Sequence, residues 1–336
     1  MITLHTTYMG IPLKNPLIVG ACNLSTDISH LKKLEAAGAA AIVYKSLFEE
    51  QIHLENLEME TQMEGFNERN AEMLSLFPDL EHAGPREFLF NLEKAVKAVS
   101  IPVFASLNAV YDETWAEWAP QIAKTGVAGL ELNFYAIPQD FSASTRDIID
   151  GQLAILEKVK KSVNIPVAVK LSPYYTNPLG AIRRMDEAGA DAFVLFNRFF
   201  QPDIDIEREQ HAFPYNLSNE DDNRLPLRFA GLLHGNVKAS VCSSMGIFHG
   251  KDVIKMILAG ADSVQVVSTL YKNGLNHLST MLKDMEDWMQ AKGYNSLDDF
   301  RGKLSRKALR DPFTYKRAQY VDILMKSNKI FDQYPV

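Results

Sequence analysis

Two lysines stand where a run of apolar residues ends. Lys45 follows "AAAIVY" and Lys170 follows "IPVAV", so both are expected at the ends of buried strands. A lysine ammonium that leaves water is costly unless an opposite charge pairs with it. Either side chain could extend into solvent, but the apolar runs offer its stem little surface to follow. Two such lysines in one pocket therefore predict an anionic ligand.

Amide and hydroxyl side chains end other apolar runs. Ser46 follows Lys45, Asn133 ends "GLELN", and Asn197 ends "FVLFN". The asparagines could bind a ligand, or they could satisfy nearby backbone groups. The stretch "ELNFYAIPQD" around Asn133 offers no Cys, Ser or His, and no Asp before its last residue, Asp140. A reaction that needs proton transfer must therefore take its acid or base from another residue type.

These polar residues would meet if their strands were parallel neighbours. Four segments join the end of an amphipathic helix through a glycine to a short apolar run, which indicates a helix C-cap followed by a strand. They are residues 34–46, 122–134, 185–197 and 256–268. Four further apolar runs alternate with them, at 16–21, 100–108, 164–172 and 236–244. Eight strands with helices between them predict an α/β fold, a (β/α)8 TIM barrel whose reaction site lies at the carboxyl ends of the strands.

An open, doubly wound sheet is the alternative architecture, but no glycine-rich dinucleotide fingerprint follows the first strand. We expect a single domain over residues 1–336. Two connections, 48–90 after the second strand and 198–232 after the sixth, are long enough to cover a substrate. Residues 275–336 are expected to form a helical tail that packs outside the barrel or at a subunit contact.

The loops after the seventh and eighth strands of such barrels commonly bind phosphate through backbone N–H groups and hydroxyls. Here these loops contain "CSSMG" (242–246) and "VVST" (266–269). The small residues that would form the cradle are Ser243, Ser244, Gly246, Ser268 and Thr269.

Composition favours a small-molecule partner. The net charge of −7 comes without a basic stripe, so nucleic acid is not an expected partner. The two cysteines, Cys22 and Cys242, lack the spacing of a disulfide framework or a metal site, and small buried hydrophobes are their simplest interpretation. No signal peptide and no apolar run of ~18 residues is evident, so we expect a cytoplasmic protein with no membrane segment.

Taken together, these residues resemble the dihydroorotate dehydrogenase family of FMN-dependent (β/α)8 barrels, most of all its class 1 branch. The resemblance spans nearly the whole chain. It rests on "NPLIVGAC" (15–22), "YKS" (44–46), "ELN" (131–133), "VKLSPY" (169–174), "FN" (196–197), "MGIFHGKDVIKMILAGADSVQVVSTL" (245–270) and "GYNSLDDFRGKL" (293–304). It implies that Ala21 and Cys22 line the flavin, and that Lys45 and Ser46 contact both flavin and substrate.

The resemblance also implies roles at the other strand ends. Asn133 and Lys170 would hydrogen-bond the isoalloxazine and ribityl groups, and Asn197 would read the amide edge of a pyrimidine. A lysine near the flavin would favour its anionic reduced form. The family carries a Cys or Ser base where this chain has Ala136. Tyr135 is the adjacent titratable group and our candidate replacement, although its ring could simply close the pocket.

Three functions follow as hypotheses. The first is an FMN oxidoreductase that converts dihydroorotate to orotate in pyrimidine biosynthesis, or acts on another planar unsaturated compound. The second is a flavoprotein whose substrate has changed or whose dehydrogenase activity is lost. The third is a non-flavin Schiff-base lyase that uses Lys45 or Lys170 as nucleophile.

The chain has no cysteine cluster for an iron–sulfur centre and no dinucleotide fingerprint, so a separate electron acceptor is expected. The resemblance also implies a homodimer.

Overall fold

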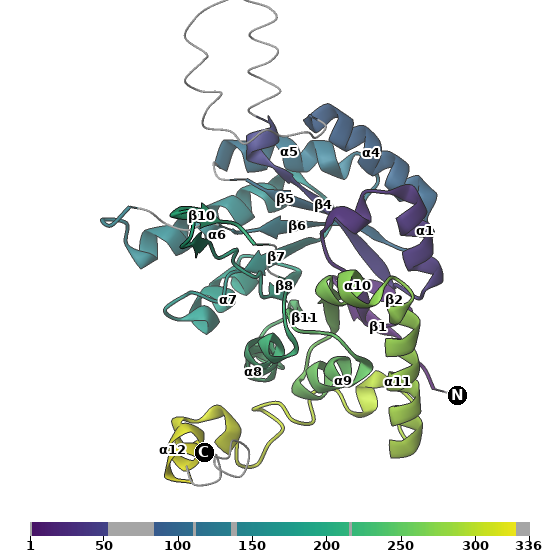
Figure 1. The fold of residues 1–336 in the computed structure, drawn as a ribbon, viewed down its shortest axis with the longest axis vertical. Coiled ribbons are helices and arrows are strands. Elements are labelled where there is room, and N and C mark those ends of the chain that lie inside the picture. Colours follow the sequence, from purple (N-terminus) through teal and green to yellow (C-terminus); the bar gives the residue numbers. More distant parts are fainter. Residues whose placement is uncertain (1, 53–83, 110–111, 136–139, 215–216, 327–336) are drawn as a thin grey trace, which may run out of the picture.

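The structure, a computed structural model, describes residues 2–52, 84–109, 112–135, 140–214 and 217–326. Eight of its strands are β3 (Leu17–Val19), β4 (Ala41–Phe48), β5 (Val103–Asn108), β6 (Gly129–Asn133), β7 (Val167–Leu171), β8 (Ala192–Leu195), β11 (Ser240–Ser244) and β12 (Ser263–Val266). They pair in parallel and close into a barrel in the order β11-β12-β3-β4-β5-β6-β7-β8 (Figure 1). The predicted (β/α)8 barrel and its eight strands are confirmed.

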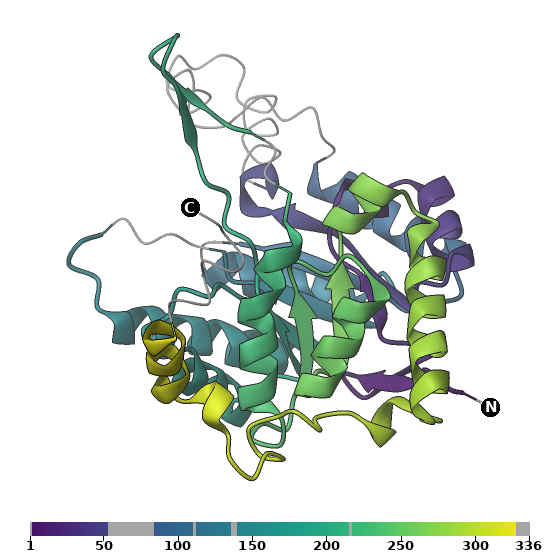
Figure 2. The ribbon, with the colours of Figure 1, turned by 60° about the horizontal axis from the view of Figure 1, so that its bottom comes forward.

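Helices follow the strands and cover the outside of the barrel (Figures 1 and 2). They are α1 (Ile28–Ala36), α4 (Pro85–Ala98), α5 (Asp112–Ala123), α6 (Thr145–Ser162), α7 (Pro178–Glu187), α8 (Arg224–Leu233), α9 (Gly250–Ala259) and the short α10 (Ser268–Asn273). The glycines of the four repeated helix-to-strand junctions all have positive φ angles, which only glycine adopts at little cost. The angles are +108° at Gly38, +85° at Gly126, +92° at Gly189 and +122° at Gly260.

Side chains alternate between the inside of the barrel and the layer under the helices. In β7, Val167, Val169 and Leu171 belong to the outer core, and Ala168 belongs to the cluster inside the barrel. Strand alternation therefore points Lys170 inward as well. The hairpin of β1 (Thr6–Tyr8) and β2 (Ile11–Leu13) adds apolar side chains to the same inner cluster. The barrel interior is thus apolar at its amino end and polar toward its carboxyl end.

The structure describes only parts of the first long connection and most of the second. The first begins after β4 and ends at α4, and residues 53–83 of it lie outside the described part of the chain. The second contains a two-stranded hairpin of β9 (Asp203–Asp205) and β10 (Gln210–Ala212), a 3-10 turn, and then α8. Residues 224–232 of the predicted connection are therefore helical and not loop.

The helical tail is confirmed in two parts. Helix α11 (His277–Lys292) packs along α9 on the outside of the barrel, with Met281, Met285 and Met289 buried (Figure 1). Helix α12 (Arg317–Met325) follows a segment of turns and 3-10 helices and has no buried residue. No helix in the described ranges is long and apolar enough to cross a membrane.

Candidate active site

A buried network of three polar side chains crosses the barrel interior. The Lys170 ammonium donates to Gln265 Oε1 at 3.1 Å and lies 3.6 Å from Glu131 Oε1. Gln265 Nε2 donates to Glu131 Oε2 at 2.5 Å. Lys170, Glu131 and Gln265 are 8%, 2% and 2% exposed. Because β6 and β12 are four places apart in a barrel of eight strands, this network joins opposite walls.

One oxygen of this network lacks a donor. Glu131 Oε1 is buried and accepts no hydrogen bond within the described residues. A buried carboxylate oxygen is normally satisfied, so its donor is expected from outside the chain, as water or as a ligand hydroxyl or N–H.

Two asparagines form a pair beside this network. Asn133 ends β6 and lies level with Lys170 in the β6–β7 register. Asn197 follows β8, and its Nδ2 donates to Asn133 Oδ1 at 2.7 Å. This bond fixes both amides and uses one donor and one acceptor. An Asn133 amide donor and an Asn197 carbonyl oxygen remain, which together match the edge of an amide or imide.

A cavity of about 200 Å³ lies above the network at the carboxyl ends of β7, β8, β11 and β12. Six of the residues chosen from the sequence line it: Ala21, Lys170, Asn197, Ser244, Gly246 and Ser268. The chain turns at Met245 and Gly246, which line this cavity and have φ angles of +77° and +66°. The Gly246 N–H donates to Ser218 Oγ across 3.4 Å, the long limit of a hydrogen bond.

Lys45 and Ser46 line a second cavity, of about 460 Å³, together with Asn23, Tyr44 and Asn91. Both residues lie within β4, where the pairing register with β5 shifts after Tyr44. Burial lowers the pKa of Lys45 from its ordinary value. Ser46 Oγ shares a hydrogen bond of 2.8 Å with Ser106 Oγ and is buried. The two predicted lysines therefore open into different cavities.

Cys22 interacts electrostatically with Lys45 and with Lys170. Burial raises the pKa of its thiol, so Cys22 is neutral near pH 7. Cys242 lies fully buried in the barrel interior, where burial raises its pKa to about 12. The prediction that Cys242 is a small buried hydrophobe is confirmed, whereas Cys22 is only partly buried.

Two predicted phosphate-binding residues lie away from the cavity. Ser243 follows the inward-facing Cys242, so its side chain faces the layer under the helices, where it is fully buried. Thr269 is inside α10, where its hydroxyl donates to Phe248 O at 3.1 Å and accepts from Asn273 at 3.0 Å. Neither hydroxyl faces the space above Lys170.

Tyr135 lies just beyond β6, at the rim of the barrel. Its hydroxyl oxygen accepts the Phe200 N–H at 2.9 Å, and its ring meets that of Phe199 edge to face with centroids 4.8 Å apart. These contacts fix the ring and leave the phenolic proton available for donation. Ala136, at the position of the family base, lies outside the described residues.

Glu131 and Gln265 were missed as site residues by the sequence analysis, which considered only the last residues of each strand. Strand alternation was the available signal. Glu131 stands two residues before Asn133, and Gln265 stands two after Ser263, which points into the barrel. Glu131 therefore faces the same side of its strand as Asn133, and Gln265 the same side as Ser263.

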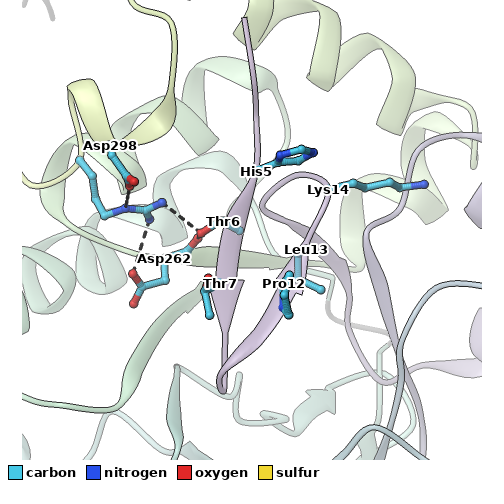
Figure 3. Close-up of a pocket in the computed structure, with 9 residues that line it drawn as sticks. His5, Thr6, Thr7, Pro12, Leu13, Lys14, Asp262 and Asp298 are labelled. Carbon is cyan, nitrogen blue, oxygen red and sulfur yellow. Dashed lines mark hydrogen bonds and ion pairs between the residues drawn. The ribbon is translucent and has the colours of Figure 1, made fainter.

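The opposite end of the barrel has a larger cavity, of about 520 Å³ (Figure 3). Its polar groups bind one another: Arg301 donates to Thr6, to Asp298 and to the carbonyl of Ala261, and lies 3.5 Å from Asp262. Because barrel enzymes carry their chemistry at the carboxyl ends of the strands, we assign this cluster a structural role. Within the described residues, no group of three His, Cys, Asp or Glu could hold a metal ion.

Comparison with known proteins gives the same family as the motifs. The family model for dihydroorotate dehydrogenase matches residues 79–289. A Thermoplasma volcanium protein named dihydroorotate dehydrogenase B (NAD(+)), catalytic subunit, is 27% identical over 90% of this chain and 98% of its own length. A Methanocaldococcus jannaschii protein of the same name is 26% identical over 81% of this chain and 88% of its own. A putative dihydroorotate dehydrogenase A (fumarate) from Aeropyrum pernix is 26% identical over 66% of this chain and 74% of its own. Since the family model covers more than half of the sequence, this chain belongs to the dihydroorotate dehydrogenase family.

Proposed function

We propose that this protein is an FMN-dependent oxidoreductase that exchanges hydride with a planar, unsaturated, amide-containing ring. The observation that carries the proposal is the buried Lys170–Glu131–Gln265 network beneath the cavity, with the Asn133–Asn197 pair beside it. Orotate, the oxidised form of the dihydroorotate in the family's name, has such a ring.

The residues around the cavity fit FMN. The unsatisfied Glu131 Oε1 needs a donor such as a ribityl hydroxyl or a ring N–H. Lys170 and Gln265 would hold the polar part of the flavin, and Ser244, Gly246 and Ser268 would hold its phosphate. Bound FMN would supply a hydride acceptor and donor at N5, which no side chain can replace.

The chain's own residues would bind the substrate and move its proton. The remaining donor of Asn133 and the remaining acceptor of Asn197 would orient an amide edge. Tyr135 Oη, held by the Phe200 N–H, would donate a proton to the substrate carbon in the reductive direction. A phenolic hydroxyl suits this direction, because it carries an O–H that can donate.

The visible spectrum of the purified protein, followed by anaerobic titration with dihydroorotate, tests the proposal. We expect flavin absorbance and, with a productive substrate, its bleaching. Tyr135→Phe should slow reoxidation of the reduced flavin by substrate at least tenfold, and an unchanged rate would remove Tyr135 from the mechanism. A colourless protein that takes up no FMN would overturn the proposal.

Ala136 favours a second candidate, a flavoprotein that has changed its substrate or lost the dehydrogenase reaction. Alanine has no group that can take the proton which a Cys or Ser takes in the family. This candidate predicts bound FMN whose absorbance is unchanged by dihydroorotate under anaerobic conditions. The titration above therefore separates it from the first.

The lowered pKa of Lys45 is the observation that favours a Schiff-base lyase as a further candidate. Burial lowers its pKa, which favours the neutral amine that attacks a carbonyl. Lys170 is the poorer nucleophile, because its ammonium lies 3.6 Å from Glu131 Oε1 and donates to Gln265 Oε1. Borohydride trapping of a carbonyl substrate on Lys45 in a protein without flavin would support the lyase.

In the proposed redox function, electrons leave through an acceptor outside this chain. With two cysteines, the sequence cannot ligate an iron–sulfur cluster by itself. The names of the relatives give NAD(+) in two cases and fumarate in one. Stopped-flow reoxidation of the reduced protein by fumarate would distinguish a free acceptor from a partner subunit.

A further inference from the structure

The cavity above the buried network has a second cation on its wall. Arg198 lines this cavity together with Lys170 and Asn197. The charge of Lys170 is opposed by Glu131 at 3.6 Å, and both side chains are almost completely buried. The Arg198 side chain is 29% exposed. A charged ligand that enters the cavity therefore meets the guanidinium of Arg198 as its accessible cation.

A carboxylate holds this guanidinium in place. Arg198 Nη1 donates to Asp222 Oδ2, and the same oxygen accepts the Asn219 N–H at 2.8 Å. Asp222 is thus fixed by the backbone of its own segment, the 3-10 helix Glu220–Asn223. A guanidinium has five N–H donors in a rigid planar fork. One contact with Asp222 therefore orients the group without using up its donors.

The segment that carries Asp222 packs against the residues proposed to hold phosphate. A Cβ on Gly246 would lie 2.9 Å from the backbone carbonyl carbon of Asp222. Ser218, just before this segment, shares a hydrogen bond of 2.8 Å with Ser268 Oγ, and its own Oγ accepts the Gly246 N–H at 3.4 Å. The guanidinium of Arg198, held by Asp222, therefore lies close to the small residues at this end of the cavity.

The small residues supply hydrogen bonds but no full positive charge. A phosphate monoester carries about −1.5 to −2 near neutral pH, so a cation beside it is expected. Lys272 is a second nearby cation, and its ammonium donates to Ser218 O at 3.0 Å and to Asn219 Oδ1 at 3.4 Å. Of these two cations, Arg198 is the one that lines the cavity. Its planar fork also matches the paired oxygens of a phosphate or a carboxylate.

We propose that Arg198 is the anion-binding side chain of this cavity, and that its guanidinium, oriented by Asp222, binds an oxyanion group of the ligand. The oxyanion is the phosphate of the flavin or a carboxylate on the ring substrate, since both present the same paired oxygens. This inference rests on the proposed flavoprotein function and adds a selectivity to it. Arg198 would favour a charged ligand over its neutral counterpart.

The first arm of the test compares two flavins on Arg198→Gln. The flavin-free protein is titrated with FMN and with riboflavin, which lacks the phosphate, and quenching of flavin fluorescence gives both dissociation constants. If the anion is phosphate, Arg198→Gln should weaken FMN binding by about tenfold or more and riboflavin binding by less than about twofold, because only FMN loses a charge-assisted contact.

The second arm compares two rings. The flavin-loaded protein is titrated with orotate and with uracil, which lacks the carboxylate, and perturbation of the flavin spectrum reports binding. If the anion is the carboxylate, Arg198→Gln should weaken orotate by about tenfold or more and leave uracil unchanged. The pair in which the loss occurs identifies the source of the oxyanion.

Two further variants sharpen the result. Arg198→Lys keeps the charge but loses the planar fork, so its preference for the charged compound should fall between those of the native protein and Arg198→Gln. Arg224→Gln is the matched control. Arg224 pairs with Asp221 at 2.8 Å in the same segment, and its side chain is 77% exposed. This control should leave all four dissociation constants unchanged.

Several results would overturn the proposal. One is an Arg198→Gln protein with unchanged affinity for all four compounds, and another is an equal loss for both members of each pair, which would give Arg198 a purely structural role. If circular dichroism shows that Arg198→Gln does not fold, Arg198→Lys decides, because native preferences in that variant would rule out the guanidinium contact.

Inorganic phosphate separates this proposal from the redox function. Calorimetric titration of the flavin-free protein should show phosphate binding that Arg198→Gln loses. A protein that takes up no FMN but binds phosphate through Arg198 would overturn the flavoprotein function and keep the anion site. A protein that binds FMN and orotate independently of Arg198 would do the reverse, and one that binds none of the three would overturn both.

Discussion

The ammonium of Lys170 and the carboxylate of Glu131 lie 3.6 Å apart, almost completely buried. At this depth each charge is stable because the other is present, since water cannot solvate either. The pair as a whole is neutral, so a ligand in the adjoining cavity meets a dipole and not a bare cation. Glu131 thus supplies the counter-charge that the sequence analysis expected from an anionic ligand.

Replacing Glu131 with Gln should leave Lys170 without that counter-charge. In the proposed flavoprotein, we expect the midpoint potential of the flavin to rise by about 30 mV or more, ~1.4 kcal/mol for a two-electron couple, because an unopposed cation stabilises the anionic reduced form. A spectroelectrochemical titration would measure the shift. Thermal unfolding of the flavin-free protein should show a loss of about 3 kcal/mol, the cost of an unpaired buried charge.

Glu157→Gln is the control, because it makes the same change in charge at a position that is exposed to solvent. It should move neither the potential nor the unfolding midpoint. An unchanged potential in Glu131→Gln would show that Glu131 has no electrostatic influence on the flavin, whatever its effect on stability.

At the residue scale, the sequence shows which polar residues stand at strand ends, but it shows less well which way their side chains point. Lys170, Asn133 and Asn197 could be chosen because each is polar directly after an apolar run, and the structure brings all three to the barrel mouth. Ser243 could not be placed from the sequence, because one residue of register decides whether a side chain faces the cavity or the helices. The Glu131–Gln265 bond joins positions 134 residues apart, and no local pattern predicts such a pairing.

At the scale of elements, the turn after β11 depends on a glycine. Gly246 has a φ of +66°, and a Cβ there would lie 2.3 Å from the Asn223 backbone nitrogen. Gly246→Ala should therefore destabilise the protein by about 2 kcal/mol, through strain and the displacement of the segment before α8. Urea unfolding would measure the loss.

Gly151→Ala is the matched control. Gly151 lies inside α6, and a Cβ there would meet no atom within 4 Å. Alanine loses less conformational entropy in a helix, so this change should stabilise the protein by roughly 0.5–1 kcal/mol. Equal effects of the two substitutions would show that the backbone at Gly246 relaxes freely.

The elements themselves were largely predictable, because four helix–glycine–strand junctions and the apolar strands recur along the chain. The connection after β8 was not. Pro226 and Gly231 weaken the helical pattern of α8, although proline suits a first turn and Gly231 packs against the Tyr315 side chain. Strand β9 reads Asp-Ile-Asp and strand β10 reads Gln-His-Ala, and a hairpin of two such short strands has no buried apolar face that a sequence pattern could reveal.

At the scale of the whole molecule, Arg301 joins three distant parts of the chain at the amino end of the barrel. Its guanidinium reaches Thr6 of β1, the carbonyl of Ala261 just before β12, and Asp298 in the tail. Asp262, at 3.5 Å, also accepts the Val241 N–H at 2.7 Å. The N-terminal hairpin, the last strand and the tail therefore share one polar contact.

Replacing Arg301 with Gln should weaken this junction in a pH-dependent way. Burial raises the pKa of Asp262 above its ordinary value, and Arg301 opposes that rise. A carboxyl with a raised folded-state pKa contributes stability below its unfolded value and loses it as pH rises through the folded value. Without Arg301 the pKa rises further, so the loss relative to the native protein should be small near pH 4 and grow to about 2 kcal/mol at pH 7. Urea unfolding at both pH values measures it.

The double substitution with Asp262→Asn separates charge from hydrogen bonding at this junction. The amide oxygen that replaces the carboxylate can still accept the Val241 N–H, but it carries no charge. In the Asp262→Asn background, the loss caused by Arg301→Gln should therefore no longer depend on pH. A loss that is equal at both pH values in the single Arg301→Gln variant would instead assign Arg301 a role through its hydrogen bonds to Thr6 and Ala261 alone.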